Sequence, residues 1–229
     1  MDVNANFTVR ASVHAEQNPW VTSPTPGVER RMLDRMGDEI ARATSIVRFV
    51  AGSYFPPHVH EGGEEYIVIE GVFQDETGDF PVGSYVRNPP QSKHKPGAVE
   101  GAIILVKLWQ FDPEDRQTVQ LQTNDMTAES VLGREGVSVI PLYRDAHENV
   151  RIEVWEAGNL LSVDEHKGFE VFVLEGSFSE GNENFIRDSW LRLPVGHGFK
   201  AVVGPEGARV WIKSEHLAET PKRPAVEKK

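Results

Sequence analysis

Short apolar runs separated by turn-forming residues dominate the hydrophobic pattern of this chain. The runs are six to ten residues long and are rich in Val, Ile, Phe, Tyr and Trp. This spacing is typical of the strands of a β-barrel or β-sandwich. The clearest runs are SIVRFVAG (45–52), EYIVIEGVF (65–73), AIILVKLWQF (102–111), VRIEVWEAG (150–158) and ARVWIK (208–213).

One segment departs from this strand pattern. Residues 29–39, ERRMLDRMGDE, have the charge distribution of a short helix. Because the segment is short and strongly charged, we expect a turn of helix or a loop beside a strand, not a core element. The pattern as a whole predicts an all-β protein.

The pattern also occurs twice along the chain. EYIVIEGVF (65–73) matches EVFVLEGSF (170–178) at five of nine positions. A proline follows the glycine of each run after the same 18 residues, at Pro89 and at Pro194. The repeat predicts two tandem copies of one β unit.

The length of the chain allows one core for each copy. Its 229 residues can form two domains of about 100 residues each, which is a common domain size. We expect an N-terminal domain over residues 1–124 and a C-terminal domain over 125–220. The polar end, 221–229, is predicted to be a flexible tail.

Charge and composition limit the binding partners, the location and the metal ligands that we expect for this protein. The net charge of −11, without a cluster of Lys and Arg, disfavours nucleic acid as a partner. No run approaches the ~20 apolar residues of a membrane span, and the first residues lack the features of a secretion signal, so a soluble cytoplasmic protein is expected. Without cysteine, any metal must be bound through nitrogen and oxygen.

The stretch HVHEGGEEYIVIEG (58–71) has the spacing of a metal site. Side chains two residues apart project from the same face of a strand, so His58 and His60 point the same way. Glu64 can join them if residues 61–63 form a bend, and His94 has to come from another strand. Three imidazoles and one carboxylate suit Zn, Fe, Mn, Ni or Cu better than Ca or Mg. A lone HxH would more often be two surface or core histidines.

Two blocks of the first copy resemble the signature motifs of the cupins. These blocks are GSYFPPHVHEGGEEYIVIEG (52–71) and GSYVRNPPQSKH (83–94), with Gln91 where the family usually has glycine. The resemblance implies two tandem cupin barrels, each a double-stranded β-helix or jelly roll. It also implies one divalent metal bound by His58, His60, Glu64 and His94. Residues 19–111 are similar to the cupin domain of ChrR-type anti-sigma factors.

The second copy has lost most of this ligand set. In the places of the four ligands it carries Asp164, His166, Glu170 and, last, Phe199. A phenylalanine in the fourth place predicts a filled apolar barrel without metal. A weak site that also uses His197 is the alternative.

Other residues near the motifs allow a structural or a functional interpretation. Glu70 and Arg87 recur as Glu175 and Arg192 in the copy without the full ligand set, so we predict that they form exposed structural ion pairs, or at least charges at the barrel rim. Arg48 could meet an anionic ligand, although a solvated strand position is the favoured interpretation.

The site and the resemblance leave two classes of function. ChrR-like character favours a regulatory module that senses a small molecule or oxidative stress, but the cysteine-containing sigma-binding segment of that family is absent. The alternative is a metal-dependent dioxygenase or related enzyme acting on a small organic substrate. We expect zinc in the first barrel, with Fe, Mn or Ni as alternatives. The expected partners are a small molecule at the metal, a regulatory protein and a second copy of the chain.

Overall fold

The computed structural model describes residues 1–38, 40–164 and 166–225, and its regular structure is almost entirely β-strand. The described residues contain two short 3-10 helices, η1 (Ala15–Gln17) and η2 (Thr123–Asp125), and no α-helix. None of their helices is long and apolar enough to cross a membrane. The predicted all-β class is confirmed. Residues 226–229 of the predicted tail lie outside the described residues.

The chain forms two compact units. Among the described residues, the first barrel consists of Met1–Ala5, Pro19–Asp125 and 222–225. The second barrel consists of Asn6–Asn18 and Met126–Pro221. These units differ from the expected domains, which kept residues 1–124 together.

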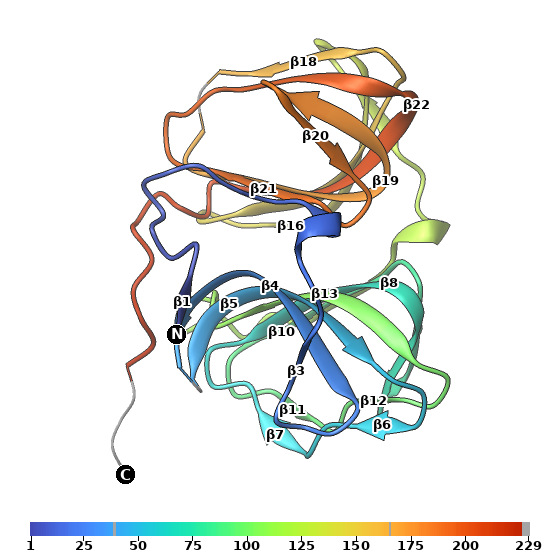
Figure 1. The fold of residues 1–229 in the computed structure, drawn as a ribbon, viewed down its shortest axis with the longest axis vertical. Helices are drawn as coiled ribbons and strands as arrows, with labels where there is room; N and C mark the ends of the chain where they lie inside the picture. Colours follow the sequence, from blue (N-terminus) through green and yellow to red (C-terminus); the bar gives the residue numbers. More distant parts are fainter. Residues whose placement is uncertain (39, 165, 226–229) are drawn as a thin grey trace. The chain divides into compact units, whose positions relative to one another are not determined.

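The main sheet of the first barrel has the strand order β1-β4-β5-β13-β8-β10-β14 (Figure 1). β12 pairs with β8 and with β6, and β9 also pairs with β8. β3 pairs with β4, and β7 and β11 form a separate two-stranded sheet. The strands are β1 (Asp2–Val3), β3 (Val21–Thr22), β4 (Val28–Gly37), β5 (Ala41–Phe49), β6 (Ser53–Tyr54), β7 (His58–Val59), β8 (Glu64–Asp75), β9 (Gly78–Pro81), β10 (Ser84–Asn88), β11 (Lys93–His94), β12 (Gly97–Ala98), β13 (Ala102–Leu108) and β14 (Val119–Gln122).

The second barrel has a matching arrangement, with the strand order β15-β16-β17-β22-β19-β21-β2. β18 pairs with β22, and β20 pairs with β19. The strands are β2 (Ala11–Val13), β15 (Glu129–Val131), β16 (Arg134–Arg144), β17 (Asn149–Trp155), β18 (Leu160–Val163), β19 (Phe169–Glu180), β20 (Glu183–Ile186), β21 (Trp190–Leu193) and β22 (Phe199–Ser214). An origin of the two barrels by internal duplication stays a prediction.

The glycine that ends the repeated run has the same steric role in both barrels. Gly71 in β8 has φ +68°, and a Cβ atom there would lie 2.1 Å from the carbonyl oxygen of Gly101. Gly176 in β19 has φ +71°, and its Cβ would lie 2.0 Å from the oxygen of Gly207. Only glycine combines this conformation with so close a backbone approach. The shared sequence EG therefore marks equivalent bends.

The predicted helical turn in residues 29–39 is wrong for residues 29–37, and residue 39 lies outside the described residues. The segment forms most of β4, which pairs with β5 from Val28↔Phe49 to Gly37↔Ala41. A register shift between Met32 and Asp34 interrupts the strict alternation of a strand. This bulge explains why the hydrophobic pattern does not have a clean period of two, since the extra residue shifts the faces.

Residues 6–18 contribute to the second barrel through β2. Ala11, Ser12 and Val13 pair antiparallel with Arg192, Leu191 and Trp190 of β21. On either side of β2, Arg10 forms an ion pair with Glu180 at 2.7 Å, and His14 lies 2.8 Å from Glu183. These contacts span about 170 residues of sequence, so local periodicity could not predict them.

The predicted ion pairs of Glu70 with Arg87 and of Glu175 with Arg192 are also wrong. Arg87 lies opposite Glu65 in the register of β10 and β8, five positions from Glu70, and forms a 2.7 Å ion pair with Asp115. In the second barrel Arg192 lies opposite Glu170, and Glu175 lies opposite Arg209. Both Arg87 and Arg192 are buried, whereas the prediction placed them on the surface.

Candidate metal centre

Three short segments of the first barrel bring the four predicted ligands together. His58 lies in β7 and pairs with His94 of β11, so the two imidazoles begin from directly opposed backbone positions. Glu64 is the first residue of β8. His60 stands between β7 and β8, where its backbone N–H donates to the carbonyl of Ser92 at 2.9 Å.

The bend between His60 and Glu64 depends on two glycines. Gly63 has φ +76° and donates its N–H to the carbonyl of His60 at 3.3 Å. A Cβ atom on Gly62 would lie 2.3 Å from the Trp109 ring, and one on Gly63 would lie 2.4 Å from the Phe111 ring. The predicted bend at residues 61–63 is present. Its glycines let the chain turn directly beneath two aromatic rings.

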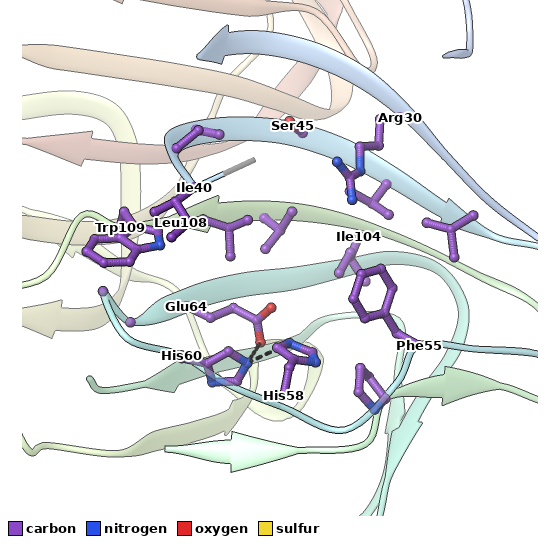
Figure 2. A pocket seen from close by; sticks show the side chains of 18 of the residues that line it. Arg30, Ile40, Ser45, Phe55, His58, His60, Glu64, Ile104, Leu108 and Trp109 are labelled. Carbon is purple, nitrogen blue, oxygen red and sulfur yellow. Dashed lines mark hydrogen bonds and ion pairs between the residues drawn. The ribbon is translucent and has the colours of Figure 1, made fainter. Parts of the chain in front are cut away.

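The ligand atoms of the four residues converge on one point. One nitrogen from each of His58, His60 and His94 and one oxygen of Glu64 all lie within 4.8 Å of one another. The Nε2 atoms of His58 and His60 are 3.2 Å apart, and Oε2 of Glu64 is 3.4 Å from Nε2 of both His60 and His94. Figure 2 shows the Glu64 carboxylate directed at the His58 and His60 rings.

The outer nitrogen of each imidazole has a partner of its own. Nδ1 of His58 lies 2.9 Å from the carbonyl oxygen of Pro56, and Nδ1 of His60 lies 2.9 Å from the Ser92 hydroxyl. Nδ1 of His94 lies 3.2 Å from a carboxylate oxygen of Asp75. An acceptor at Nδ1 holds the proton there and leaves the Nε2 lone pair free for a metal.

These contacts fit a metal ion at the point of convergence. Donor atoms bound about 2.0–2.2 Å from one ion lie roughly 3.0–3.6 Å apart when they are neighbours around it. The observed separations of 3.2 and 3.4 Å fall in this range. The buried Nε2 of His94 also has no hydrogen-bond partner among the described residues. The cluster could therefore hold a divalent transition metal.

The protonation state of His60 suits this role. Burial lowers the pKa of His60 below its ordinary value, and this effect outweighs the opposing attraction of the Glu64 carboxylate. The nearby imidazoles of His94 and His58 lower the pKa further. At neutral pH the imidazole is therefore uncharged, which is the form that binds metals.

Three residues of the cluster line a cavity of about 420 Å³ in the first barrel. Small-molecule sites commonly have volumes of about 300–1,000 Å³. The cavity walls are mostly apolar, and His58, His60 and Glu64 lie on one side of it in Figure 2. Apolar wall residues include Val28, Val47, Phe49, Phe55, Phe73 and Ile104.

The second barrel has no equivalent site among the described residues. Glu170 occupies the place of Glu65, not that of Glu64. The indole N–H of Trp190 donates to its carboxylate at 2.7 Å, and Nε2 of His216 lies 3.2 Å from it. The place of Glu64 is taken by Phe169, which packs on Phe199 with ring centroids 5.0 Å apart.

The other candidate ligands of this barrel are not assembled. Asp164 is exposed and accepts a hydrogen bond from Ser162, whereas His166 is buried against Phe169. No group of metal-ligating residues that includes Asp164, His166 or Glu170 is found in residues 1–38, 40–164 and 166–225. Trp155, Phe178 and Phe185 fill the interior beside Phe199. The predicted apolar interior of the second barrel is confirmed, whereas its lack of a metal ion stays a prediction.

Sequence reasoning missed three residues around the first site. Asp75 and Ser92 orient ligand imidazoles, and Arg30 lines the cavity. Asp75 is the last residue of β8, the strand that begins with Glu64, but only the fold brings it to His94. Arg30 lay within the segment that we expected to be a helical turn. Arg48 does not line the cavity and pairs with Glu29, so the less favoured interpretation, contact with an anionic ligand in this cavity, has no support.

Comparisons with known proteins agree with this geometry. Residues 8–112 match the family model of the ChrR cupin-like domain. No curated protein matches the chain in sequence.

Solved structures extend the likeness to both barrels. A proposed dioxygenase from Nostoc punctiforme is 14% identical with a TM-score of 0.72, over 100% of this chain and 87% of that chain. The nickel(II) complex of the pirin YhhW from Escherichia coli is 11% identical with a TM-score of 0.63, over 90% of this chain and 98% of that chain. A 7S globulin from Momordica charantia is 12% identical with a TM-score of 0.62, over 90% of this chain and 84% of that chain.

At these identities the solved structures establish the fold alone, because proteins with different roles share it. The predicted fold of two tandem cupin barrels is confirmed. Residues 8–112 of the chain match the ChrR cupin-like domain, and both barrels have the fold of the solved cupin structures.

Proposed function

We propose that the first barrel is a metal-dependent binding module for a small organic molecule. The observation that carries this proposal is the convergence of four metal-ligating side chains, three of which line a cavity of about 420 Å³. A ligand in the cavity would lie beside the ion. The protein ligands in this proposal are His58, His60, Glu64 and His94.

Zinc is the metal that we favour, with Fe, Mn and Ni as alternatives. All four ions accept imidazole nitrogen and carboxylate oxygen. Four protein ligands complete the usual shell of a structural zinc ion, which suits a regulatory module. Six-coordinate Fe or Mn would keep two positions for a small molecule. The identity of the metal therefore separates regulation from catalysis.

The regulatory form of the proposal follows from the ChrR cupin-like domain. It requires a protein partner that responds to the ligand state of the barrel, and it is compatible with a homodimer. Because the chain contains no cysteine, the sigma-binding segment of ChrR-type proteins is not part of this proposal. A cytoplasmic location stays a prediction from the sequence.

The second candidate function is a metal-dependent dioxygenase or related enzyme. The observation that favours it is the apolar cavity beside the ligand cluster, since such a cavity excludes water from a reacting substrate. The bound metal would supply Lewis-acid or oxygen chemistry. In this candidate the protein residues hold and orient the substrate against the cluster.

Metal reconstitution tests both candidates. The protein is stripped with a chelator, loaded in turn with Zn, Mn, Ni or anaerobic Fe(II), and analysed for bound metal. We expect about one ion per chain and a loss of most of it in His94→Ala, because one ligand is removed. His147→Ala, at an exposed histidine outside the cluster, is the matched control and should retain the ion.

The same preparations distinguish regulation from catalysis. Oxygen consumption by the Fe(II) form with added organic substrates would support the enzyme, whereas ligand binding to the zinc form without turnover would support the sensor. Wild-type protein that binds no metal, or a His94→Ala variant with wild-type metal content, would contradict the proposal.

A further inference from the structure

Arg30 is a cationic side chain in the wall of an otherwise mostly apolar cavity. It lies in β4, opposite Val47 of β5, and its side chain is half-buried. In Figure 2 its guanidinium points into the cavity from the wall opposite His58, His60 and Glu64. A ligand that spans the cavity would therefore meet Arg30 at one end and the metal centre at the other.

Neighbouring arginines have partners within the protein, whereas Arg30 has none in the part of the chain that the structure describes. Arg48 donates two hydrogen bonds to Glu29, Arg35 donates one to the carbonyl of Asp38, and Arg31 stacks on Trp20. No hydrogen bond or ion pair of Arg30 is found among the described residues. A half-buried guanidinium without a partner leaves its donors available to a ligand.

The charges around Arg30 favour an anion. Burial lowers the pKa of Arg30, and the charge of Arg35, which also lines the cavity, lowers it further. Arginine remains protonated at physiological pH in spite of such shifts. The acidic residues in the described cavity lining are Glu61, which is exposed, and Glu64, which faces the imidazoles. An anion near Arg30 would offset the repulsion between two half-buried cations.

We propose that the cavity of the first barrel binds a small organic acid, with its carboxylate on Arg30 and its apolar body against β5 and β13. The planar guanidinium fork matches a carboxylate through two parallel hydrogen bonds. Val47, Phe49 and Ile104 offer apolar contact for the rest of the molecule. This inference rests on the proposed function, because the other end of the acid would face the metal ion.

Pairs of a carboxylic acid and its neutral amide test whether the cavity prefers a negatively charged ligand. Saturated carboxylates from butanoate to octanoate, and the corresponding neutral amides, are titrated into the zinc-loaded full-length protein by calorimetry or ligand-observed NMR. We expect at least one acid to bind roughly tenfold to a hundredfold more tightly than its amide, which is the effect of a charge-assisted bidentate contact. Equal affinity within every pair, including no binding of either member, would overturn the inference.

Variants assign the effect to Arg30. Arg30→Gln should abolish the preference for acids, and Arg30→Lys should restore part of it, because lysine keeps the charge without the fork. Arg48→Gln is the matched control, since Arg48 comes from the neighbouring strand and does not line the cavity, and it should bind acids as the wild type does. Metal content and melting temperature verify that each variant is folded. An Arg30→Gln protein that retains the full preference would overturn the inference.

The two proposals fail in different ways. If the protein binds no metal, the proposed function fails, and the acid titration is then read on the metal-free protein. If the protein binds metal but prefers no acid to its amide, only the role of Arg30 is wrong.

Discussion

At the scale of single residues, the geometry of the metal centre depends on more than the four ligands. Each imidazole is held from behind by an acceptor, and for His94 that acceptor is the carboxylate of Asp75. The other oxygen of Asp75 accepts two hydrogen bonds from Thr77, at 2.6 and 2.7 Å. The contacts with Thr77 fix the carboxylate of Asp75, which lies outside the cluster and orients the His94 ring.

The first prediction concerns this carboxylate. Asp75→Asn should weaken metal binding by roughly 10–100-fold, because the anionic acceptor behind His94 is lost while all four ligands stay. Competition against a chelator of known affinity measures the change. Asp79→Asn, at an exposed aspartate in the adjacent β9, is the matched control. Equal metal affinity of Asp75→Asn and wild-type protein would mean that Asp75 has no role in orienting His94.

The second prediction concerns the filled barrel. Restoring a histidine through Phe199→His should not create a second metal site, because Phe169 occupies the place of the carboxylate and Asp164 is exposed. We expect a loss of about 2–4 kcal/mol in the free energy of unfolding, since a polar ring replaces a buried phenyl ring. Urea unfolding and metal analysis measure the two effects.

A matched control for this variant is Leu132→His, which adds a histidine at a fully exposed position. It should change stability by no more than about 0.5 kcal/mol. Binding of a second ion by Phe199→His would show that the second barrel has kept a working ligand set.

At the scale of elements, buried ion pairs fasten neighbouring strands of the second barrel. Glu153 in β17 is fully buried and accepts two hydrogen bonds from Arg134 of β16, both at 2.7 Å. Arg151 and Trp155 of β17 donate to the same carboxylate at 2.7 Å each. Although burial raises the pKa of Glu153, these donors lower it more, so the net pKa lies below its ordinary value.

The third prediction follows from this shift. A carboxyl group whose pKa is lower in the folded state stabilises the fold above its unfolded pKa of about 4.3, and the contribution is lost as the pH falls through the folded pKa. Glu153→Gln should therefore cost about 3 kcal/mol at neutral pH and clearly less at about pH 3. Urea unfolding at both pH values measures this difference. Glu156→Gln, at an exposed glutamate just beyond β17, should have little effect at either pH.

A constant destabilisation by Glu153→Gln across this pH range would contradict the predicted role of the charge. It would mean that the loss of a hydrogen-bond acceptor destabilises the variant and that the ionisation of the carboxyl group does not contribute.

The elements also show how far the sequence can predict the fold and the site. Turn residues and apolar runs predicted the all-β class, and the motif spacing identified the four side chains that converge in the structure. The bulge in β4 hid a strand, because a register shift removes the alternation on which the prediction depends. The sequence comparison aligned Glu170 with Glu64, whereas the structure aligns it with Glu65. This error of one residue also concerns strand register, since a shift of one residue moves a side chain to the opposite face of a strand. Partners such as Asp75 and Arg30 depend on long-range pairing.

At the scale of the whole molecule, the chain does not complete the first barrel before it enters the second. The segment Asn6–Asn18 belongs to the second barrel, whereas the residues before and after it belong to the first. Its strand β2 covers the edge of β21, where unpaired backbone groups would otherwise be exposed.

The fourth prediction concerns this segment. Deletion of residues 1–18 should raise amide hydrogen exchange in β21 (Trp190–Leu193), because its outer pairing partner is lost. The equivalent β10 (Ser84–Asn88) pairs with β8 and β14, so its exchange should stay unchanged. Exchange followed by mass spectrometry compares the two peptides within one sample. Equal protection of β21 in both proteins would argue against a stabilising role for β2.

The most direct test of the central claim is X-ray absorption spectroscopy at the edge of the metal bound to the first barrel. The account predicts a shell of three imidazole nitrogens and at least one oxygen at about 2.0–2.2 Å, with loss of one imidazole contribution in His94→Ala. A shell of oxygen atoms alone, or a spectrum that His94→Ala leaves unchanged, would contradict the claim that His58, His60, Glu64 and His94 bind the ion together.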